Sequence, residues 1–169
     1  MSGNIVLIGM MGCGKSTVGR LTAEKLGMRF VDTDEQIERG TGRTIPALFA
    51  EEGEDYFRDR ELDVSRELAR ARGLVIACGG GLPTRREAIA CLKSSGPVFW
   101  LNRDPGRIYD TVSMAGRPLG QGGREAFLER FRRREPIYRE WADYIIEGHT
   151  LAREAAERIA AIYTKECQP

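Results

Sequence analysis

The 169-residue sequence has almost no excess charge of either sign, because 26 lysines and arginines stand against 25 aspartates and glutamates. Surfaces that bind nucleic acid or an anionic membrane usually carry a basic excess, so we expect neither partner. No apolar run approaches the ~18 residues of a membrane-spanning helix. The first residues, MSGNIVLIGMMG, also lack the basic start and long apolar core of a secretory signal. We therefore expect a cytoplasmic protein.

Histidine and cysteine are too sparse to suggest a zinc site. His149 is the single histidine, and the four cysteines, which fall in no C-x-x-C spacing, are Cys13, Cys78, Cys91 and Cys167. Cys13 and Cys78 lie inside glycine-rich motifs described below, which argues against their use as disulfide partners. We expect free thiols and a reducing compartment.

The chain reads as one domain over residues 1–169, without repeats, linkers or low-complexity segments. Five short, continuously apolar runs predict strands covered on both faces, at residues 5–8, 29–31, 74–77, 98–101 and 144–146. Amphipathic segments between them predict helices at residues 15–26, 34–39, 45–50, 53–71, 85–93, 104–112, 124–142 and 151–164. This alternation predicts an α/β fold in which helices flank a five-stranded parallel sheet in three layers.

Residues 9–16, GMMGCGKS, match the phosphate-binding pattern G-x-x-x-x-G-K-[ST]. The motif follows a predicted strand and opens a predicted helix, and this context identifies a P-loop. Glycine lets the backbone N–H groups of Gly12, Cys13 and Gly14 point at phosphate oxygens, while the helix N-terminus adds its positive dipole end.

Three side chains at the start of this helix fit the chemistry of a nucleoside triphosphate. Lys15 can reach the β- and γ-phosphates, and Ser16 can enter the coordination shell of Mg²⁺. Thr17 adds a hydroxyl near the α-phosphate. The motif therefore predicts binding of ATP with Mg²⁺.

Two polar motifs follow the second and third predicted strands, at the sheet edge where parallel α/β proteins bind ligands. In Asp32-Thr33-Asp34, one carboxylate can serve the Mg²⁺ shell while the other accepts the proton of an attacking hydroxyl. The alternative is that Asp32 or Thr33 only caps a helix. Three glycines, Gly79, Gly80 and Gly81, suit close approach of a ligand to the backbone or a sharp turn before Pro83, and both can hold.

Residues 113–123, SMAGRPLGQGG, are too rich in glycine to form a helix or strand. A long loop of this kind in a compact domain is typical of a functional lid, with a tolerant surface loop as the alternative. Arg117 in its middle favours the lid, because an arginine there can close over phosphates. The sequence has no NKxD guanine motif, which argues against a GTPase.

Taken together, the motifs resemble shikimate kinases over nearly the whole chain. The resemblance rests on IGMMGCGKSTVGRLTAEKL, FVDTDEQIERGTGRTIPALFAEEGEDYFRDRE, CGGG, GRPL and RREPIYRE, in that order. It implies a P-loop kinase fold of the nucleoside-monophosphate-kinase type, with an acceptor-binding region at about residues 33–61 and a mobile lid at about 113–124. It also implies transfer of the γ-phosphoryl group of ATP to shikimate.

The resemblance assigns roles to individual residues. Asp34 would bind the shikimate hydroxyls and act as base, and Asp32 would lie near Mg²⁺ through water. Arg58 and Arg139 would hold the shikimate carboxylate, which suits the bidentate geometry of guanidinium groups. The backbone of the three consecutive glycines would touch the ring of shikimate, and Arg117 would act on the phosphates.

Some points stay open. Where such kinases often place an adenine-stacking arginine, seven residues before Arg117, this chain has Asp110, with Arg107 one turn earlier as a possible substitute. Kinases for gluconate or nucleoside monophosphates on the same scaffold, and a nucleotide-dependent regulatory module, are the rival interpretations. We expect a monomer, since no coiled-coil seam is visible.

Overall fold

A computed structural model describes residues 3–114 and 122–167. All five expected strands form and lie in one parallel sheet, in the order β2-β3-β1-β4-β5. Their bounds are β1 Ile5–Ile8, β2 Arg29–Asp32, β3 Leu74–Ala77, β4 Val98–Leu101 and β5 Tyr144–Ile146. Because all strands run the same way, their carboxyl ends share one edge of the sheet, as the predicted α/β fold requires.

The helices are α1 Lys15–Leu26, α2 Thr33–Thr41, α3 Ile45–Arg70, α4 Arg86–Lys93, α5 Pro105–Met114, α6 Gly123–Trp141 and α7 Ala152–Ile162. A 3₁₀ turn, η1 Leu82–Thr84, precedes α4, and a π-helical end, η2 Tyr163–Cys167, follows α7. Each expected helix forms within one or two residues of its predicted bounds. The two helices expected at 45–50 and 53–71 are joined as α3, which is interrupted at Gly53 by a non-helical backbone (φ 85°, ψ 175°) that glycine adopts readily.

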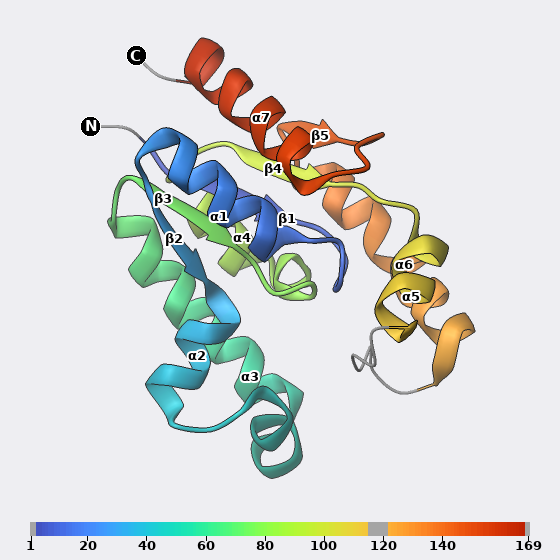
Figure 1. The fold of residues 1–169 in the computed structure, drawn as a ribbon. Coiled ribbons are helices and arrows are strands. Elements are labelled where there is room, and N and C mark those ends of the chain that lie inside the picture. Colours follow the sequence, from blue (N-terminus) through green and yellow to red (C-terminus); the bar gives the residue numbers. More distant parts are fainter. Residues whose placement is uncertain (1–2, 115–121, 168–169) are drawn as a thin grey trace.

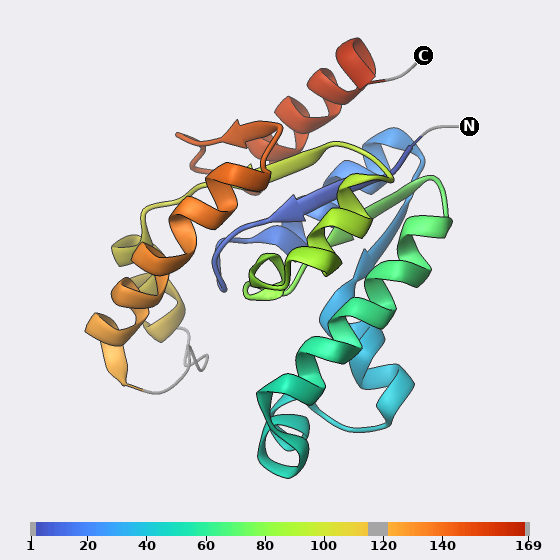
Figure 2. The same ribbon diagram turned by 180° about the vertical axis from the view of Figure 1, so that it is seen from behind.

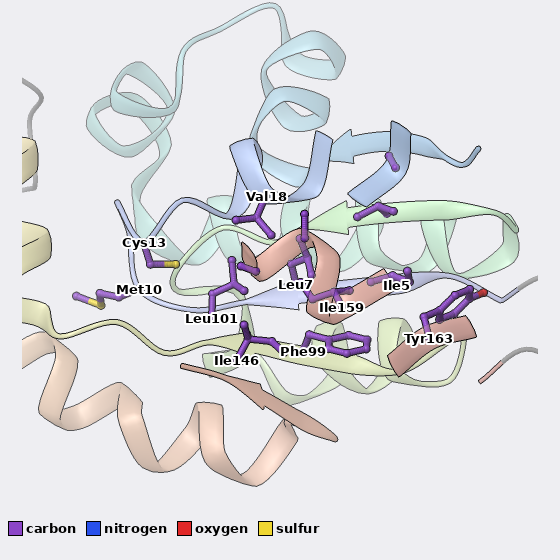
Figure 3. Packing of buried hydrophobic residues seen from close by; sticks show 14 of the residues in the cluster. Ile5, Leu7, Met10, Cys13, Val18, Phe99, Leu101, Ile146, Ile159 and Tyr163 are labelled. Atoms are coloured by element: carbon purple, nitrogen blue, oxygen red, sulfur yellow. The ribbon is translucent and has the colours of Figure 1, made fainter. Parts of the chain in front are cut away.

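Alternate residues of the central strand pack on opposite faces of the sheet, which explains its continuously apolar sequence. Ile5 and Leu7 belong to a core with α1 and α7, whereas Val6 and Ile8 belong to a core with α3, α4 and α6. Figures 1 and 2 show these helix layers from opposite sides, and Figure 3 shows the first core at close range. The three-layer prediction is confirmed.

Two helical regions flank the carboxyl edge of the sheet. Helix α2 and the first part of α3 form one of them around a small core of their own, made by Ile37, Leu48 and Phe57. Helices α5 and α6 form the other, and the loop after β1 lies between the two regions in both views (Figures 1 and 2). Among the described residues, no helix is long and apolar enough to cross a membrane.

Candidate active site

The loop between β1 and α1 has the backbone of a phosphate cradle. Gly9, Gly12 and Gly14 all have positive φ, at 147°, 81° and 96°. Gly14 caps α1 without any side-chain hydrogen bond, so the amide groups at the start of that helix are left for a ligand. The amide of Cys13 donates to the carbonyl oxygen of Met10 at 3.1 Å, so the anion-binding geometry lies with the glycines and the first amides of α1.

Lys15 lies buried inside this loop, with only 9% of its surface exposed. Its Nζ donates to the carbonyl oxygens of Gly9 (2.8 Å) and Met10 (3.0 Å) and lies 3.6 Å from Sγ of Cys13. All three partners are uncharged. The positive charge is thus fixed in place by the loop and is not neutralised by it, which suits a phosphate as its counter-charge.

Ser16 and Asp32 meet where the P-loop faces the end of β2. The Ser16 hydroxyl donates to Oδ2 of Asp32 at 2.8 Å. The other oxygen, Oδ1, accepts from the amides of Asp34 (2.9 Å) and Glu35 (3.3 Å), so Asp32 also caps α2. Asp32 is therefore the helix cap of the alternative interpretation, and its second oxygen also faces the Ser16 hydroxyl. A hydroxyl and a carboxylate side by side form a hard oxygen donor set that fits Mg²⁺.

Two hollows open at this edge of the sheet and meet at Asp34. The phosphate hollow, of about 280 Å³, is lined by the P-loop with Thr17, Asp32, Asp34, Cys78, Gly79 and Gly80. The acceptor hollow, of about 150 Å³, is lined by Met11, Asp34, Ile45, Phe49, Phe57, Arg58, Glu61, Gly79, Gly80, Gly81 and Arg134. The shared wall contains one ionisable side chain, Asp34. That carboxyl group therefore faces both hollows.

The Asp34 carboxyl group has an unusual environment. Its Oδ1 is buried and has no hydrogen-bond partner among the described residues. Burial raises its pKa to about 6, with the charge of Asp32 adding to the shift while Lys15 and Arg58 oppose it. A carboxylate with a pKa close to neutrality is suited to accept a proton at physiological pH.

Two of the three glycines after β3, Gly79 and Gly81, are explained by side chains that pack against their backbone. A Cβ on Gly79 would lie 2.7 Å from Oδ1 of Asp34 and 3.1 Å from Oε1 of Glu61. A Cβ on Gly81 would collide with the guanidinium group of Arg58. The amide of Gly79 also donates to Oγ1 of Thr33 at 2.9 Å, which ties this loop to the end of β2. Glycine is needed here so that the polar groups of the acceptor hollow can crowd around the loop.

Arg58 is held in the acceptor hollow by carboxylates of its own helix. Its Nη1 lies 2.5 Å from Oε2 of Glu61, and its Nη2 lies 3.3 Å from Oε1 of Glu54. Glu61 is fully buried, and burial raises its pKa to about 7 against the opposing charge of Arg58. The sequence motifs did not single out Glu61, although it follows Arg58 by three residues on one helix face.

The second arginine of the acceptor hollow is Arg134, whereas the expected residue was Arg139. Arg139 does not line the hollow: it pairs with Glu135 at 3.1 Å, and its side chain is 57% exposed. Arg134 lines the hollow opposite Arg58 and makes no ion pair among the described residues. Burial and the like charge of Arg58 lower its pKa, but an arginine stays charged near neutral pH. Arg58 and Arg134 both line this hollow, and Arg134 has no carboxylate partner among the described residues. Together they form a site that suits an anion.

Comparisons with known proteins agree with this geometry. The family model described as shikimate kinase matches residues 11–164. The chain belongs to the shikimate kinase family. It is 43% identical to a shikimate kinase of Methylococcus capsulatus, over 96% of this chain and 93% of that one. It is 43% identical to one of Clostridium beijerinckii, over 88% and 87% of the two chains.

A solved structure of a shikimate kinase from Acinetobacter baumannii, in complex with shikimate, has a TM-score of 0.90 and 39% identity to this chain. The alignment covers 99% of this chain and 97% of that one. The expected family and the P-loop kinase fold are therefore confirmed, and the chain is an ATP-using kinase of the shikimate kinase family. The assignment of roles to individual residues remains a prediction.

The structure describes only part of the predicted lid of this shikimate kinase family member. Arg117 and most of the predicted lid, residues 113–124, lie outside the described residues. Asp110, at the position of the expected adenine-stacking arginine, pairs with Arg124 at 3.2 Å and so links α5 to α6. Arg107 lines a separate hollow of about 300 Å³ with His149 and others, beyond the ends of β4 and β5. A role for Arg107 in place of the adenine-stacking arginine stays a prediction.

Proposed function

We propose that the protein transfers the γ-phosphoryl group of ATP to the 3-hydroxyl of shikimate, giving shikimate 3-phosphate and ADP for aromatic amino-acid biosynthesis. The observation that carries this proposal is the position of Asp34, which lines both the phosphate hollow and the acceptor hollow. A group there can act on a hydroxyl held in one hollow as it attacks a phosphate held in the other. The family membership of the chain supports the choice of shikimate as acceptor.

The acceptor would be held by its carboxylate and by its hydroxyl groups. Arg58 and Arg134 offer two guanidinium groups to the carboxylate, and charge-assisted bonds of this kind give both strength and orientation. We propose Arg134 for this role in place of Arg139, because Arg139 faces solvent and pairs with Glu135. The backbone of Gly79, Gly80 and Gly81 lines the same hollow and would contact the ring.

The chemical step would need one proton acceptor. The oxygen of the shikimate hydroxyl attacks the γ-phosphorus, its proton passes to the Asp34 carboxylate, and the bond from phosphorus to the ADP oxygen breaks. Lys15 and the P-loop amides would stabilise the charge that develops on the phosphate oxygens. Mg²⁺, held near Ser16 and Asp32, would neutralise phosphate charge when bound. Arg117 would add positive charge from the lid.

The size of the acceptor hollow weighs against a nucleotide acceptor. At about 150 Å³ it is smaller than the ~300 Å³ at which pockets for drug-sized ligands begin. A nucleotide acceptor would also need a place for its base. Gluconate carries a carboxylate as shikimate does, so the two arginines alone do not separate these acceptors, and a direct comparison must.

Release of ADP from Mg-ATP in a coupled assay tests the function, with shikimate, gluconate, AMP and CMP offered in parallel. We expect shikimate alone to stimulate ADP release strongly. The Lys15→Ala variant, which lacks the phosphate-binding ammonium, serves as the control for contaminating ATPase and should show no stimulation. A larger response to another acceptor would leave the chain a P-loop kinase but refute shikimate as its substrate, and slow ATPase indifferent to all acceptors would favour the regulatory module.

A further inference from the structure

Tyr138 occupies a junction between three parts of the site without lining either hollow. It lies on α6, is fully buried, and packs its ring 5.8 Å from the ring of Trp100. Its hydroxyl donates to the carbonyl oxygen of Gly80 at 2.6 Å and lies 3.8 Å from Sδ of Met10. One phenol therefore contacts the glycine loop and the P-loop from a helix that belongs to neither.

The arginine of the acceptor hollow lies at the same glycine. A Cβ on Gly80 would be 3.6 Å from Nη1 of Arg134, and the charge of Arg134 acts on the Tyr138 hydroxyl. The two residues are four apart on α6 and so lie on one helix face. The Arg134 guanidinium group and the Tyr138 hydroxyl therefore meet at the backbone of Gly80.

The backbone of Gly80 is tightly packed on its other side. A Cβ on Gly80 would lie 3.0 Å from the amide nitrogen of Met11 and 3.5 Å from the carbonyl oxygen of Gly9. The backbone of Gly80 is therefore packed directly against the P-loop. A group that is anchored to the Gly80 carbonyl is held at a fixed distance from the phosphate hollow.

We propose that Tyr138 is a positioning residue for the acceptor, which acts by fixing the Arg134 guanidinium relative to Gly80 and the P-loop. The inference rests on the proposed function, since it assumes that Arg134 binds the acceptor carboxylate. Arg134 makes no ion pair among the described residues, and its guanidinium group lies at Gly80 beside the Tyr138 hydroxyl that is bonded to that glycine. A guanidinium group oriented before binding loses less conformational entropy when it takes up its ligand.

A buried tyrosine could instead only stabilise the core. A second buried tyrosine of the chain serves as a matched control for that role. Tyr163 is also fully buried, and its hydroxyl donates to the carbonyl oxygen of Gly3 at 2.8 Å. Figure 3 shows Tyr163 at the opposite end of β1 from Met10. Removal of either hydroxyl leaves a buried carbonyl group without this donor, which should lower stability to a similar degree.

The test compares Tyr138→Phe with Tyr163→Phe in steady-state assays with shikimate and with ATP as the varied substrate. We expect Tyr138→Phe to raise the KM for shikimate about tenfold, because the Arg134 guanidinium group loses the polar neighbour that is bonded to Gly80. Its KM for ATP should change by less than about twofold, because the P-loop contacts of Lys15 and Ser16 are retained. Tyr163→Phe should leave both KM values unchanged.

A double-mutant cycle tests whether Tyr138 acts through Arg134. In an Arg134→Ala background, adding Tyr138→Phe should cause no further rise in the KM for shikimate. An unchanged shikimate KM in Tyr138→Phe, an equal rise in the ATP KM, or full additivity with Arg134→Ala would each overturn the proposal. If Tyr138→Phe fails to fold even at 15 °C, the hydroxyl serves the fold and the proposal is also overturned. None of these outcomes bears on the proposed function, because the acceptor assay of the wild-type protein tests that function separately.

Discussion

Replacement of Asp34 by asparagine is expected to lower kcat by about 10³-fold, the usual range for loss of a general base. Asparagine keeps the shape of the side chain but cannot accept the hydroxyl proton. Asp34 is the ionisable group shared by the two hollows. The measurement is ADP release at saturating ATP and shikimate, with Asp55→Asn, an exposed site on α3, as the matched control.

The same substitution should make the protein more stable. The Asp34 carboxylate is buried with one oxygen unpartnered among the described residues, and its pKa is raised from 3.8 to about 6. A raised carboxyl pKa means that the charged form is less favourable in the folded chain than in the unfolded chain. The cost is therefore absent below pH 3.8 and fully present above pH 6. We expect Asp34→Asn to increase the free energy of unfolding by roughly 1–3 kcal/mol at pH 7.5.

Urea unfolding at pH 7.5 and at pH 4 measures this effect, and the gain should largely disappear at the lower pH. When a residue serves catalysis at a cost to folding stability, its replacement lowers activity and raises stability. A variant that is inactive because it is unfolded would explain nothing. Near-normal turnover in folded Asp34→Asn would remove the proposed base from the mechanism.

Truncation of Arg134 should weaken acceptor binding far more than truncation of Arg139. Arg134 lines the acceptor hollow without an ion-pair partner among the described residues, whereas Arg139 is largely exposed and already paired with Glu135. Loss of a charge-assisted contact to a carboxylate costs about 1.5–3 kcal/mol. We therefore expect Arg134→Ala to raise the KM for shikimate about 100-fold and Arg139→Ala to raise it by less than about threefold.

The KM for ATP is the internal reference for this pair, since neither arginine lines the phosphate hollow. It should stay within about twofold of the wild-type value in both variants. A large effect of Arg139→Ala with little effect of Arg134→Ala would restore the assignment that the sequence motif suggested. Equal effects of the two would mean that the carboxylate is bound elsewhere.

The sheet and the P-loop could be predicted because their sequences carry a local physical signal. Continuous apolar runs such as Ile5–Ile8 are typical of strands that are buried on both faces. The motif around Lys15 specifies both the backbone conformation of the P-loop and the position of its lysine. In the same way, the acidic pair after β2 was expected at the carboxyl edge because every strand of a parallel sheet ends there.

The second arginine was not predictable from the motif alone, because a motif fixes a position along the chain and not the helix face that points inward. Arg139 directly follows the buried Tyr138 and so faces about 100° away from it, whereas Arg134 lies one turn before it on the same face. Helix periodicity taken from Tyr138 would have selected Arg134. The reason for Gly79 and Gly81 was not predictable either, because it depends on side chains of α2 and α3 that are distant in the sequence, those of Asp34, Glu61 and Arg58.

The central claim is that Asp34 and its two hollows direct phosphate to the 3-hydroxyl of shikimate, and the product itself tests this most directly. The chain would be incubated with Mg-ATP and shikimate, and the product examined by ³¹P and ¹H NMR. We predict one phosphomonoester whose phosphorus couples to the proton on C3, together with an equal amount of ADP. Inorganic phosphate in place of an ester, or an ester at another hydroxyl, would contradict the account.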